Sequence, residues 1–375
     1  MKKQVKLKDV AIHSKGKQIN GDDLILDGEF DYLNGGVNPS GKWNKFNASP
    51  NTVTISEGGN SSGYVNFMSN PFWCGAHCYY LYNLKTEPRY LYYALKSQEV
   101  RLMNLRTGSA MPNIKKSVLG DFVFNIDNDK NEQKKITNVL DKLSMMIHLK
   151  SKQLSDYDQL IKSQFVEMFG DPKVNPSKWI ASPMGDYMDV LTDFSSNGSY
   201  KHLDSNVVMY DEPNYALMIR TTDLEKGDFI NGVKYINKKA YEILGKSKIY
   251  GGEIIMNKIG SAGRIFLMPK LDIPVSLGRN AFLFRFNDNI NNIFLYYLLS
   301  SEYGRVEIKQ KVRGAVTQTI TKDGARSVKI IVPPIELQNQ FAEFVKQVDK
   351  LKFAVKESLD EVQTLFDSLM QKYFG

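Results

Sequence analysis

The chain of 375 residues repeats itself once, and this duplication constrains its fold more than any other feature. The stretch "YLYYALKS" at Tyr90–Ser97 returns as "FLYYLLSS" at Phe294–Ser301. "QFVEMFG", ending at Gly170, is answered by "SLMQKYFG", ending at Gly375. Three further pairs keep the register between these anchors: Gly108 with Gly314, Ile114 with Ile320, and Gln133 with Gln338. Such self-similarity predicts a tandem duplication whose first parts have diverged.

Each copy ends in a long segment whose apolar residues fall three and four positions apart, the heptad pattern of a coiled coil. The apolar seam includes Leu143, Ile147, Leu154, Tyr157 and Ile161 in the first copy, and Val348, Leu351, Val355, Leu359, Val362 and Phe366 in the second. At about 1.5 Å per residue each helix would be roughly 55–60 Å long, too long to bury its seam alone. Two arrangements are open: each helix folds onto its own domain, or the two pair antiparallel. Seams of matched length favour the pair.

The segments before the helices indicate mixed α/β domains. Short β-branched and aromatic runs such as "NTVTI", "YVNFM", "IIMNKI" and "RIFLM" are typical of strands. One amphipathic helix is expected in each domain, at 89–106 and 292–312, before a "GSAMPNIKK" or a "GAVTQTITK" loop. The fold class is therefore α+β: a tandem repeat of two mixed α/β domains, each followed by a long helix, with the helices pairing as an antiparallel coiled coil. The predicted division is a domain at 1–130, a helix at 131–170, a domain at 171–334 and a helix at 335–375.

Composition narrows the classes of protein. No apolar run reaches the ~18 residues of a membrane span, so no membrane association is expected. Cys74 and Cys78 are too few for a disulfide framework, which favours a reducing, cytoplasmic location. The net charge of +8 is consistent with a nucleic-acid partner but is weak support alone.

The glycine-rich stretch "TISEGGNSSGYV" at Thr54–Val65 raises the question of a phosphate-binding loop. Such loops need a Lys after the last glycine, and here Tyr64 follows Gly63. The repeat places "IIMNKIGSAGRI" opposite it, with Gly263 matching Gly63, and that copy also lacks the Lys-Ser/Thr signature. Both stretches are interpreted as tight turns between strands, with glycines at positive φ.

No catalytic or metal centre stands out. "VPPI" at Val332–Ile335 lacks the acidic or amide group and the aromatic ring of an adenine methyltransferase motif, and its prolines suit a helix start. Asp288, Glu307 and Lys309 resemble a nuclease triad only in order, and helix surface charges explain them better. "CGAHC" at Cys74–Cys78 offers too few ligands for zinc, so core packing is the preferred interpretation.

Taken together, these stretches resemble the DNA specificity (S) subunit of type I restriction-modification systems. The resemblance rests on "YLNGGVNPSGKWNKFN" followed by "TISEGGNSSGYV" in the first copy, and on "RTTDLEKGDF" followed by "GGEIIMNKIGSAGRIF" in the second. The helices begin at "NEQKKI" and "PPIELQNQF" and finish in "FVEMFG" and "QKYFG". It covers essentially the whole chain.

The resemblance implies a non-catalytic protein with two target recognition domains, each reading one half of a bipartite sequence in double-stranded DNA. The paired helices would separate these domains and dock two methyltransferase (M) subunits, which restriction (R) subunits join. No cofactor is expected on this chain, because S-adenosylmethionine, ATP and Mg would be bound by the partner subunits. The alternative is a stand-alone DNA methyltransferase or nuclease; a coiled-coil scaffold that never touches DNA is the third hypothesis.

Candidate DNA contacts follow from physical criteria, since phosphates favour Lys, Arg and small polar groups on loops, while base edges favour Arg, Asn, Gln or Lys. The candidates in the first domain are Lys42, Lys45, Arg106, Lys115 and Lys116, and those in the second are Arg279, Asn280, Arg313, Gln318 and Lys322. For any one of them a solvated surface charge is an equally good explanation.

Overall fold

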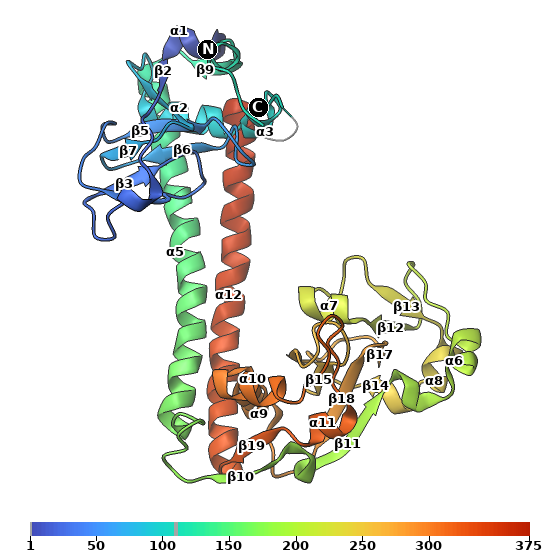
Figure 1. The fold of residues 1–375 in the computed structure, drawn as a ribbon. Coiled ribbons are helices and arrows are strands. Elements are labelled where there is room, and N and C mark those ends of the chain that lie inside the picture. Colours follow the sequence, from blue (N-terminus) through green and yellow to red (C-terminus); the bar gives the residue numbers. More distant parts are fainter. Residues whose placement is uncertain (1, 109–111) are drawn as a thin grey trace. The chain divides into compact units, whose positions relative to one another are not determined.

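A computed structural model describes residues 2–108 and 112–375 (Figure 1). The chain forms two compact units, one made of Met1–Gln153 with Val355–Gly375 and the other of Leu154–Ala354. We call them the first unit and the second unit. Each long helix therefore contributes one part to each unit. Part of the predicted "GSAMPNIKK" loop, residues 109–111, lies outside the described residues.

The first unit combines three small sheets with short helices. The four-stranded sheet has the order β2-β8-β5-β6, the three-stranded sheet the order β4-β3-β7, and β1 pairs with β9. The strands are β1 (Lys2–Lys6), β2 (Ile12–Lys15), β3 (Phe30–Leu33), β4 (Gly41–Trp43), β5 (Thr52–Ser56), β6 (Val65–Met68), β7 (Phe72–Cys74), β8 (Cys78–Tyr82) and β9 (Val123–Asp127). The helices are α1 (Leu7–Val10), α2 (Pro88–Lys96), α3 (Glu99–Met103), α4 (Lys116–Gly120) and the start of α5 (Lys130–Phe169).

The second unit repeats this topology with additions. Its sheets have the orders β11-β18-β15-β16 and β13-β12-β17-β14, and β10 pairs with β19. The strands are β10 (Ile180–Pro183), β11 (Met188–Asp193), β12 (Ala216–Ile219), β13 (Lys234–Ile236), β14 (Lys248–Ile249), β15 (Ile254–Asn257), β16 (Ile265–Leu267), β17 (Val275–Leu277), β18 (Ala281–Phe286) and β19 (Lys329–Val332). The helices are α6 (Tyr200–Asn206), α7 (Thr221–Lys226), α8 (Lys238–Ile243), α9 (Asn292–Ser300), α10 (Glu302–Lys309), α11 (Lys322–Arg326) and the start of α12 (Ile335–Phe374).

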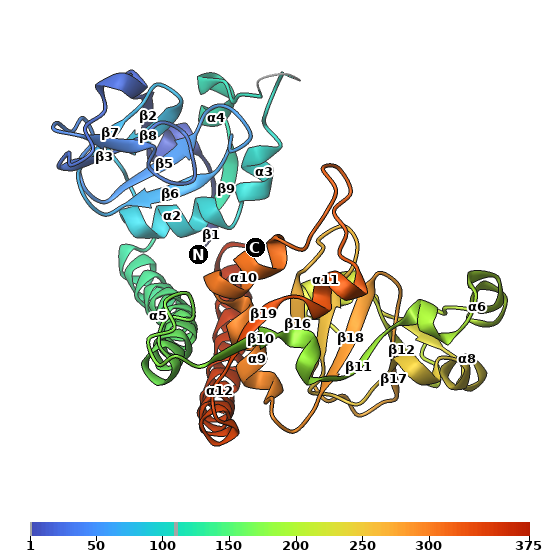
Figure 2. The same cartoon turned by 60° about the horizontal axis from the view of Figure 1, so that its bottom comes forward.

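The duplication is visible in strand pairing. β3 runs parallel to β7 in the first unit, as β12 does to β17 in the second. The sheets β2-β8-β5-β6 and β11-β18-β15-β16 are both antiparallel throughout. Figure 2 shows β11 and β18 of the second unit side by side. Strand β14 and helices α6 and α8 have no counterpart in the first unit, so the first part of the second copy is longer.

One buried glutamine in each unit fastens the long helix to the N-cap of a shorter helix, α2 in the first unit and α9 in the second. Gln133 accepts a hydrogen bond from the N–H of Glu87, the residue that caps α2, and donates one to the carbonyl of Asp127. Gln338 accepts from the N–H of Asn291, which caps α9. Both glutamines are at most 2% exposed, so their amides need these partners. The repeated Gln thus has a structural cause.

The prediction of a single amphipathic helix at 89–106 and at 292–312 was wrong. Each segment forms two helices, α2 with α3 in the first unit and α9 with α10 in the second. In the second unit, Ser301 leaves the helical conformation at ψ 167° and its side chain accepts from the N–H of Gly304. A Cβ on Gly304 would lie 2.4 Å from the carbonyl oxygen of Leu298, so glycine permits the close contact between the two helices. An N-cap inside the apolar pattern therefore ends the first helix.

The two long helices are confirmed, with 40 residues each. In the first unit, Ile136 and Leu140 of α5 share one hydrophobic cluster with Phe374 of α12. In the second unit, Ile161 of α5 shares a cluster with Val348 of α12. In each unit an early part of one helix thus meets a late part of the other, as antiparallel pairing requires.

Most of the predicted seam is shielded from solvent. Buried or half-buried positions are Leu143, Ile147, Leu154, Tyr157, Ile161, Val348, Val355, Leu359, Val362 and Phe366. The prediction that Leu351 belongs to the apolar seam was wrong, since this side chain is 52% exposed. Its neighbour Lys352 is half-buried instead and forms an ion pair with Asp158 at 2.6 Å. Among the described residues, no helix is both long and apolar enough to cross a membrane.

Candidate nucleic-acid interface

The glycine-rich stretches are tight turns, as predicted, and join β5 to β6 and β15 to β16. Gly63 and Gly263 have φ values of +90° and +86°, in the left-handed region that glycine adopts without strain. A Cβ on Gly63 would lie 2.6 Å from the backbone nitrogen of Met103, and one on Gly263 would lie 2.4 Å from Ile308. Each turn therefore packs closely against a short helix, α3 in the first unit and α10 in the second.

Each glycine turn is hydrogen-bonded to a loop that carries several of the predicted DNA contacts. We call it the late loop; it comprises residues 106–108 and 112–115 of the described chain in the first unit and 313–321 in the second. Two backbone hydrogen bonds join turn and loop in each unit, at matching positions. They run from the Gly59 N–H to the Pro112 carbonyl (2.9 Å), from the Ile114 N–H to the Glu57 carbonyl (2.9 Å), from the Gly260 N–H to the Gln318 carbonyl (3.0 Å), and from the Ile320 N–H to the Lys258 carbonyl (3.0 Å). Main-chain hydrogen bonds thus join the glycine turn to the described part of the late loop in each unit, and together they form one surface.

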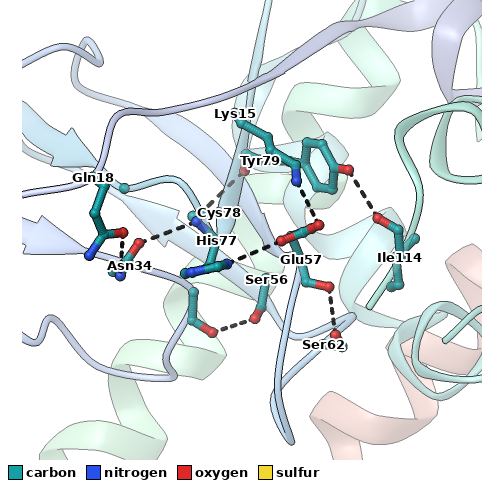
Figure 3. Close-up of polar contacts among 12 residues, drawn as sticks. Lys15, Gln18, Asn34, Ser56, Glu57, Ser62, His77, Cys78, Tyr79 and Ile114 are labelled. Carbon is teal, nitrogen blue, oxygen red and sulfur yellow. Dashed lines mark hydrogen bonds and ion pairs between the residues drawn. The ribbon is translucent and has the colours of Figure 1, made fainter. Parts of the chain in front are cut away.

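The first unit holds a buried carboxylate, that of Glu57, at the start of the glycine turn, and Figure 3 shows its polar contacts. Glu57, 8% exposed, accepts from Lys15 Nζ at 2.6 Å and lies 3.4 Å from His77 Nδ1. Lys15 ends β2, Glu57 follows β5, and His77 precedes β8. The Lys15 ammonium also lies 5.6 Å from the ring centre of Tyr79. Burial and the charge of Glu57 raise the pKa of Tyr79 to about 12, so the phenol stays protonated and donates to the Ile114 carbonyl at 2.9 Å.

The second unit holds the same kind of cluster with the charges exchanged. Asp193, 4% exposed, ends β11 and accepts from Lys258 Nζ at 3.0 Å. Lys322 Nζ lies 3.4 Å from the other carboxylate oxygen. Although burial opposes its ionisation, hydrogen bonds from Ser196, Lys258 and Ser195 hold the pKa of Asp193 below its usual range. Asp193 is therefore ionised at neutral pH.

The predicted contacts of the first unit fall into two groups. Lys42 on β4 and Lys45 just after it are exposed and belong to the three-stranded sheet, apart from the glycine turn. Arg106, Lys115 and Lys116 are exposed on the late loop and at the start of α4. The structure thus brings three of the five candidates to the surface formed by turn and loop.

The predicted contacts of the second unit lie on or beside the equivalent surface. Arg313 and Gln318 are exposed on the late loop, and Lys322 begins α11. Asn280 has φ +67°, and its carbonyl accepts from the Lys258 N–H at 2.7 Å. Arg279 forms an ion pair with Asp204, so its guanidinium is already engaged.

The Cys74 and Cys78 thiols are free and buried, so the structure places both in the core. Hydrogen bonding to Cys78 and burial raise the pKa of the Cys74 thiol. Within residues 2–108 and 112–375, no group of three or more His, Cys, Asp and Glu side chains is placed to hold a metal ion.

Sequence reasoning missed the two buried clusters. It selected Lys322 and Asn280 but not Lys15, Glu57, His77, Asp193 or Lys258, because each cluster is assembled by strands far apart in the chain. One sequence feature could have pointed to the clusters. Glu57 follows β5 and Lys258 follows β15, so residues of opposite charge occupy the same position of the repeated turn.

These observations define a class: a duplicated α/β protein in which each copy presents a cation-bearing loop on a glycine turn, a surface suited to an anionic polymer. The chain belongs to the type I restriction modification DNA specificity domain family, whose model matches residues 2–156 and 191–363. Its role in such a system is DNA recognition, not catalysis, and it carries two target recognition domains.

Relatives agree in sequence and in fold. The chain is 26% identical over 380 residues to a putative type I specificity subunit of Mycoplasma genitalium, covering 96% of this chain and 90% of that protein. It is 21% identical over 299 residues to a type I restriction enzyme specificity subunit of Methanocaldococcus jannaschii, covering 75% of this chain and 68% of that protein. The crystal structure of a type I restriction-modification system S subunit from M. genitalium matches with a TM-score of 0.69 at 22% identity, covering 100% of this chain and 96% of that one.

Proposed function

We propose that the chain reads a bipartite double-stranded DNA target, one half with the domain at 1–130 and the other with the domain at 171–334. The observation that carries the proposal is the repeated joining of a glycine turn to a cation-bearing late loop in each unit. A duplicated surface suits a split target, as dimeric DNA-binding proteins match two half-sites with two equal surfaces.

The long helices act as the spacer between the two recognition domains. The shared hydrophobic clusters in each unit support antiparallel pairing of α5 and α12 along their length. At about 1.5 Å per residue, 40 residues extend about 60 Å. The number of base pairs between the two half-sites is therefore expected to change with the length of these helices.

The chain assembles with two methyltransferase subunits, and restriction subunits join that core. Exposed apolar side chains on the long helices support docking of protein partners there, including Met145 at 56%, Leu149 at 50% and Phe353 at 64% exposure. S-adenosylmethionine, ATP and Mg are bound by these partners, and this chain contributes the recognition of the DNA sequence.

Co-expression with the cognate methyltransferase in a host without adenine methylation tests the proposal. Mapping methylated adenines is expected to give one bipartite motif with a fixed gap, and omitting this chain is expected to abolish methylation. Methylation at scattered adenines, or at an undivided motif, would contradict bipartite reading.

A second assay separates recognition from catalysis. The purified chain, given S-adenosylmethionine and DNA containing the mapped motif, is expected to transfer no methyl group. Robust transfer without a partner would support a stand-alone methyltransferase instead.

A further inference from the structure

The two buried clusters occupy equivalent backbone positions. Lys15 pairs across β2 and β8 with Tyr79, and Asp193 pairs across β11 and β18 with Phe282. The residue after the next strand is Glu57 in one unit and Lys258 in the other.

The backbone hydrogen bonds agree with this equivalence. The Glu57 N–H donates to the His77 carbonyl at 2.8 Å, and the Lys258 N–H donates to the Asn280 carbonyl at 2.7 Å. The ammonium group lies 5.6 Å from the ring of the matched aromatic residue in both units. The same site therefore carries Lys15–Glu57 in the first unit and Asp193–Lys258 in the second, which is a pair with its charges exchanged.

In both units the carboxylate has a second nitrogen partner. His77 and Lys322 each lie 3.4 Å from it, farther than the first partner, and their side chains are 57% and 37% exposed. The carboxylates themselves are at most 8% exposed. A buried carboxylate needs a counter-charge and further hydrogen bonds to its remaining lone pairs, and the second nitrogen contributes to both. Because the side chains of His77 and Lys322 are partly exposed, they can also reach groups outside the protein.

The second partners belong to the surface formed by turn and loop. Lys322 follows the late loop directly, and its Nζ also contacts Ser196 Oγ at 3.0 Å. His77 lies in the turn whose carbonyl accepts from the glycine turn. The buried carboxylate thus holds two nitrogen-bearing side chains at the edge of this surface in each unit.

We propose that Glu57 and Asp193 are positioning residues of DNA recognition, each holding a pair of nitrogen-bearing side chains for contact with the acceptor groups of DNA. The pairs are Lys15 with His77 in the first unit and Lys258 with Lys322 in the second. The lysine closest to the carboxylate is Lys15, at the end of β2, in the first unit and Lys258, after β15, in the second. The two units therefore contact their half-sites with different geometry. The inference rests on the proposed bipartite function.

Asp193→Asn tests whether the carboxylate positions the lysines or only lies near the DNA, because the two explanations predict opposite changes in DNA affinity. A carboxylate that is merely near DNA repels phosphate, so its neutralisation would strengthen binding. A carboxylate that positions Lys258 and Lys322 would, when neutralised, weaken binding by roughly tenfold at the second half-site. Asp189→Asn is the matched control, because Asp189 is exposed on the same strand and the charge change is equal.

The probe is a pool of random duplexes, bound by the complex of the full chain with its cognate methyltransferase and then sequenced. The Asp193→Asn complex is expected to keep the first half of the wild-type motif and lose information in the second half, while Asp189→Asn keeps both. An unchanged motif with equal or tighter binding overturns the inference. A wild-type complex that enriches no bipartite motif contradicts the proposed function instead.

The first unit supplies an independent arm if Asp193→Asn impairs folding of the second unit. Glu57→Gln is expected to affect the first half-site only. The double variant Lys15→Asp with Glu57→Lys copies the charge arrangement of the second unit and is expected to restore the thermal midpoint lost in Glu57→Gln, while reading of the first half-site stays altered. Full recovery of the motif would mean that the pair only supports the fold, and would overturn the inference.

Discussion

The first and second units each bury an ion pair at the same place in the fold, but with the positions of the acidic and basic residues exchanged. Glu57 with Lys15, and Asp193 with Lys258, occupy matched sites beneath matched glycine turns. The same backbone therefore accommodates an ion pair at this place with the cation supplied from either of two strands. The surface above the pair does depend on that choice, since Lys15 is 43% exposed and Lys258 only 20%. A duplicated framework can thus be kept while the groups it presents to DNA change.

The largest difference expected between the units concerns the matched phenylalanines at the ends of the long helices. Phe169 lies 4.9, 4.7 and 5.5 Å from the rings of Phe165, Phe294 and Phe341, whereas Phe374 lies 5.2 Å from Tyr90. Phe169→Ala is expected to lower the free energy of unfolding of the second unit by about 5 kcal/mol, and Phe374→Ala that of the first unit by about 3 kcal/mol.

Hydrogen exchange resolved by unit measures these losses. Phe353→Ala is the control, because that side chain is 64% exposed and its removal is expected to change stability by less than about 0.5 kcal/mol. Equal losses in Phe169→Ala and Phe374→Ala would show that the additional aromatic neighbours of Phe169 contribute little.

The glycine turns give the next difference. A Cβ on Gly63 would meet the backbone of Met103, which cannot rotate away, whereas a Cβ on Gly263 would meet the Ile308 side chain. Gly63→Ala is therefore expected to destabilise by about 3 kcal/mol and Gly263→Ala by about 2 kcal/mol. Gly59→Ala is the control, because its φ is positive but no atom lies within 4 Å of the added Cβ, and about 1 kcal/mol is expected. Denaturant midpoints rank the three variants.

The late loops differ in how far their arginines are engaged. Arg106 donates to the carbonyls of Met103 at 2.7 Å and Asn60 at 3.4 Å, whereas the described residues give the Arg313 guanidinium no partner. Arg313→Ala is expected to cost about 1–3 kcal/mol of DNA binding and to relax one base position. Arg106→Ala is expected to weaken binding less and evenly across sequences. Sequencing of bound duplexes distinguishes them, and equal relaxation by both variants would contradict this contrast.

The elements that could be predicted from sequence are those whose signal is local and repeated. The heptad spacing of Ile161 and Val348 fixed the long helices, because a seam at three and four positions has no other regular solution. The strands around the glycine turns followed from alternating apolar residues bounded by turn residues.

What could not be predicted depends on long-range pairing or on a cap within an apolar pattern. Lys15 and Glu57 are neighbours only because β8 lies between β2 and β5, and no local pattern encodes that order. Ser301 interrupts an apolar pattern that otherwise continues into α10, so the helix break was missed. Which of the candidate DNA contacts read bases is likewise set by DNA geometry, and those contacts stay predictions.

The smallest expected effect compares two aspartates with lowered pKa values, Asp193 in the second unit and Asp121 in the first. Hydrogen bonds from Lys8 and Lys6 lower the pKa of the exposed Asp121, whereas Asp193 is held below its usual pKa despite burial. A pKa lower in the folded state stabilises the fold above the unfolded value of about 3.9, and this stability is lost as the pH falls below it. The stability differences between wild type and Asp193→Asn or Asp121→Asn should thus be full at pH 7 and shrink below about pH 4.

In 1 M salt, where the Debye length is about 3 Å, only the Asp121 difference should vanish, because the Asp193 cluster is shielded from ions. Unfolding curves over pH at two salt concentrations measure both, and an Asp193 effect that disappears in salt would show that its pair is open to solvent.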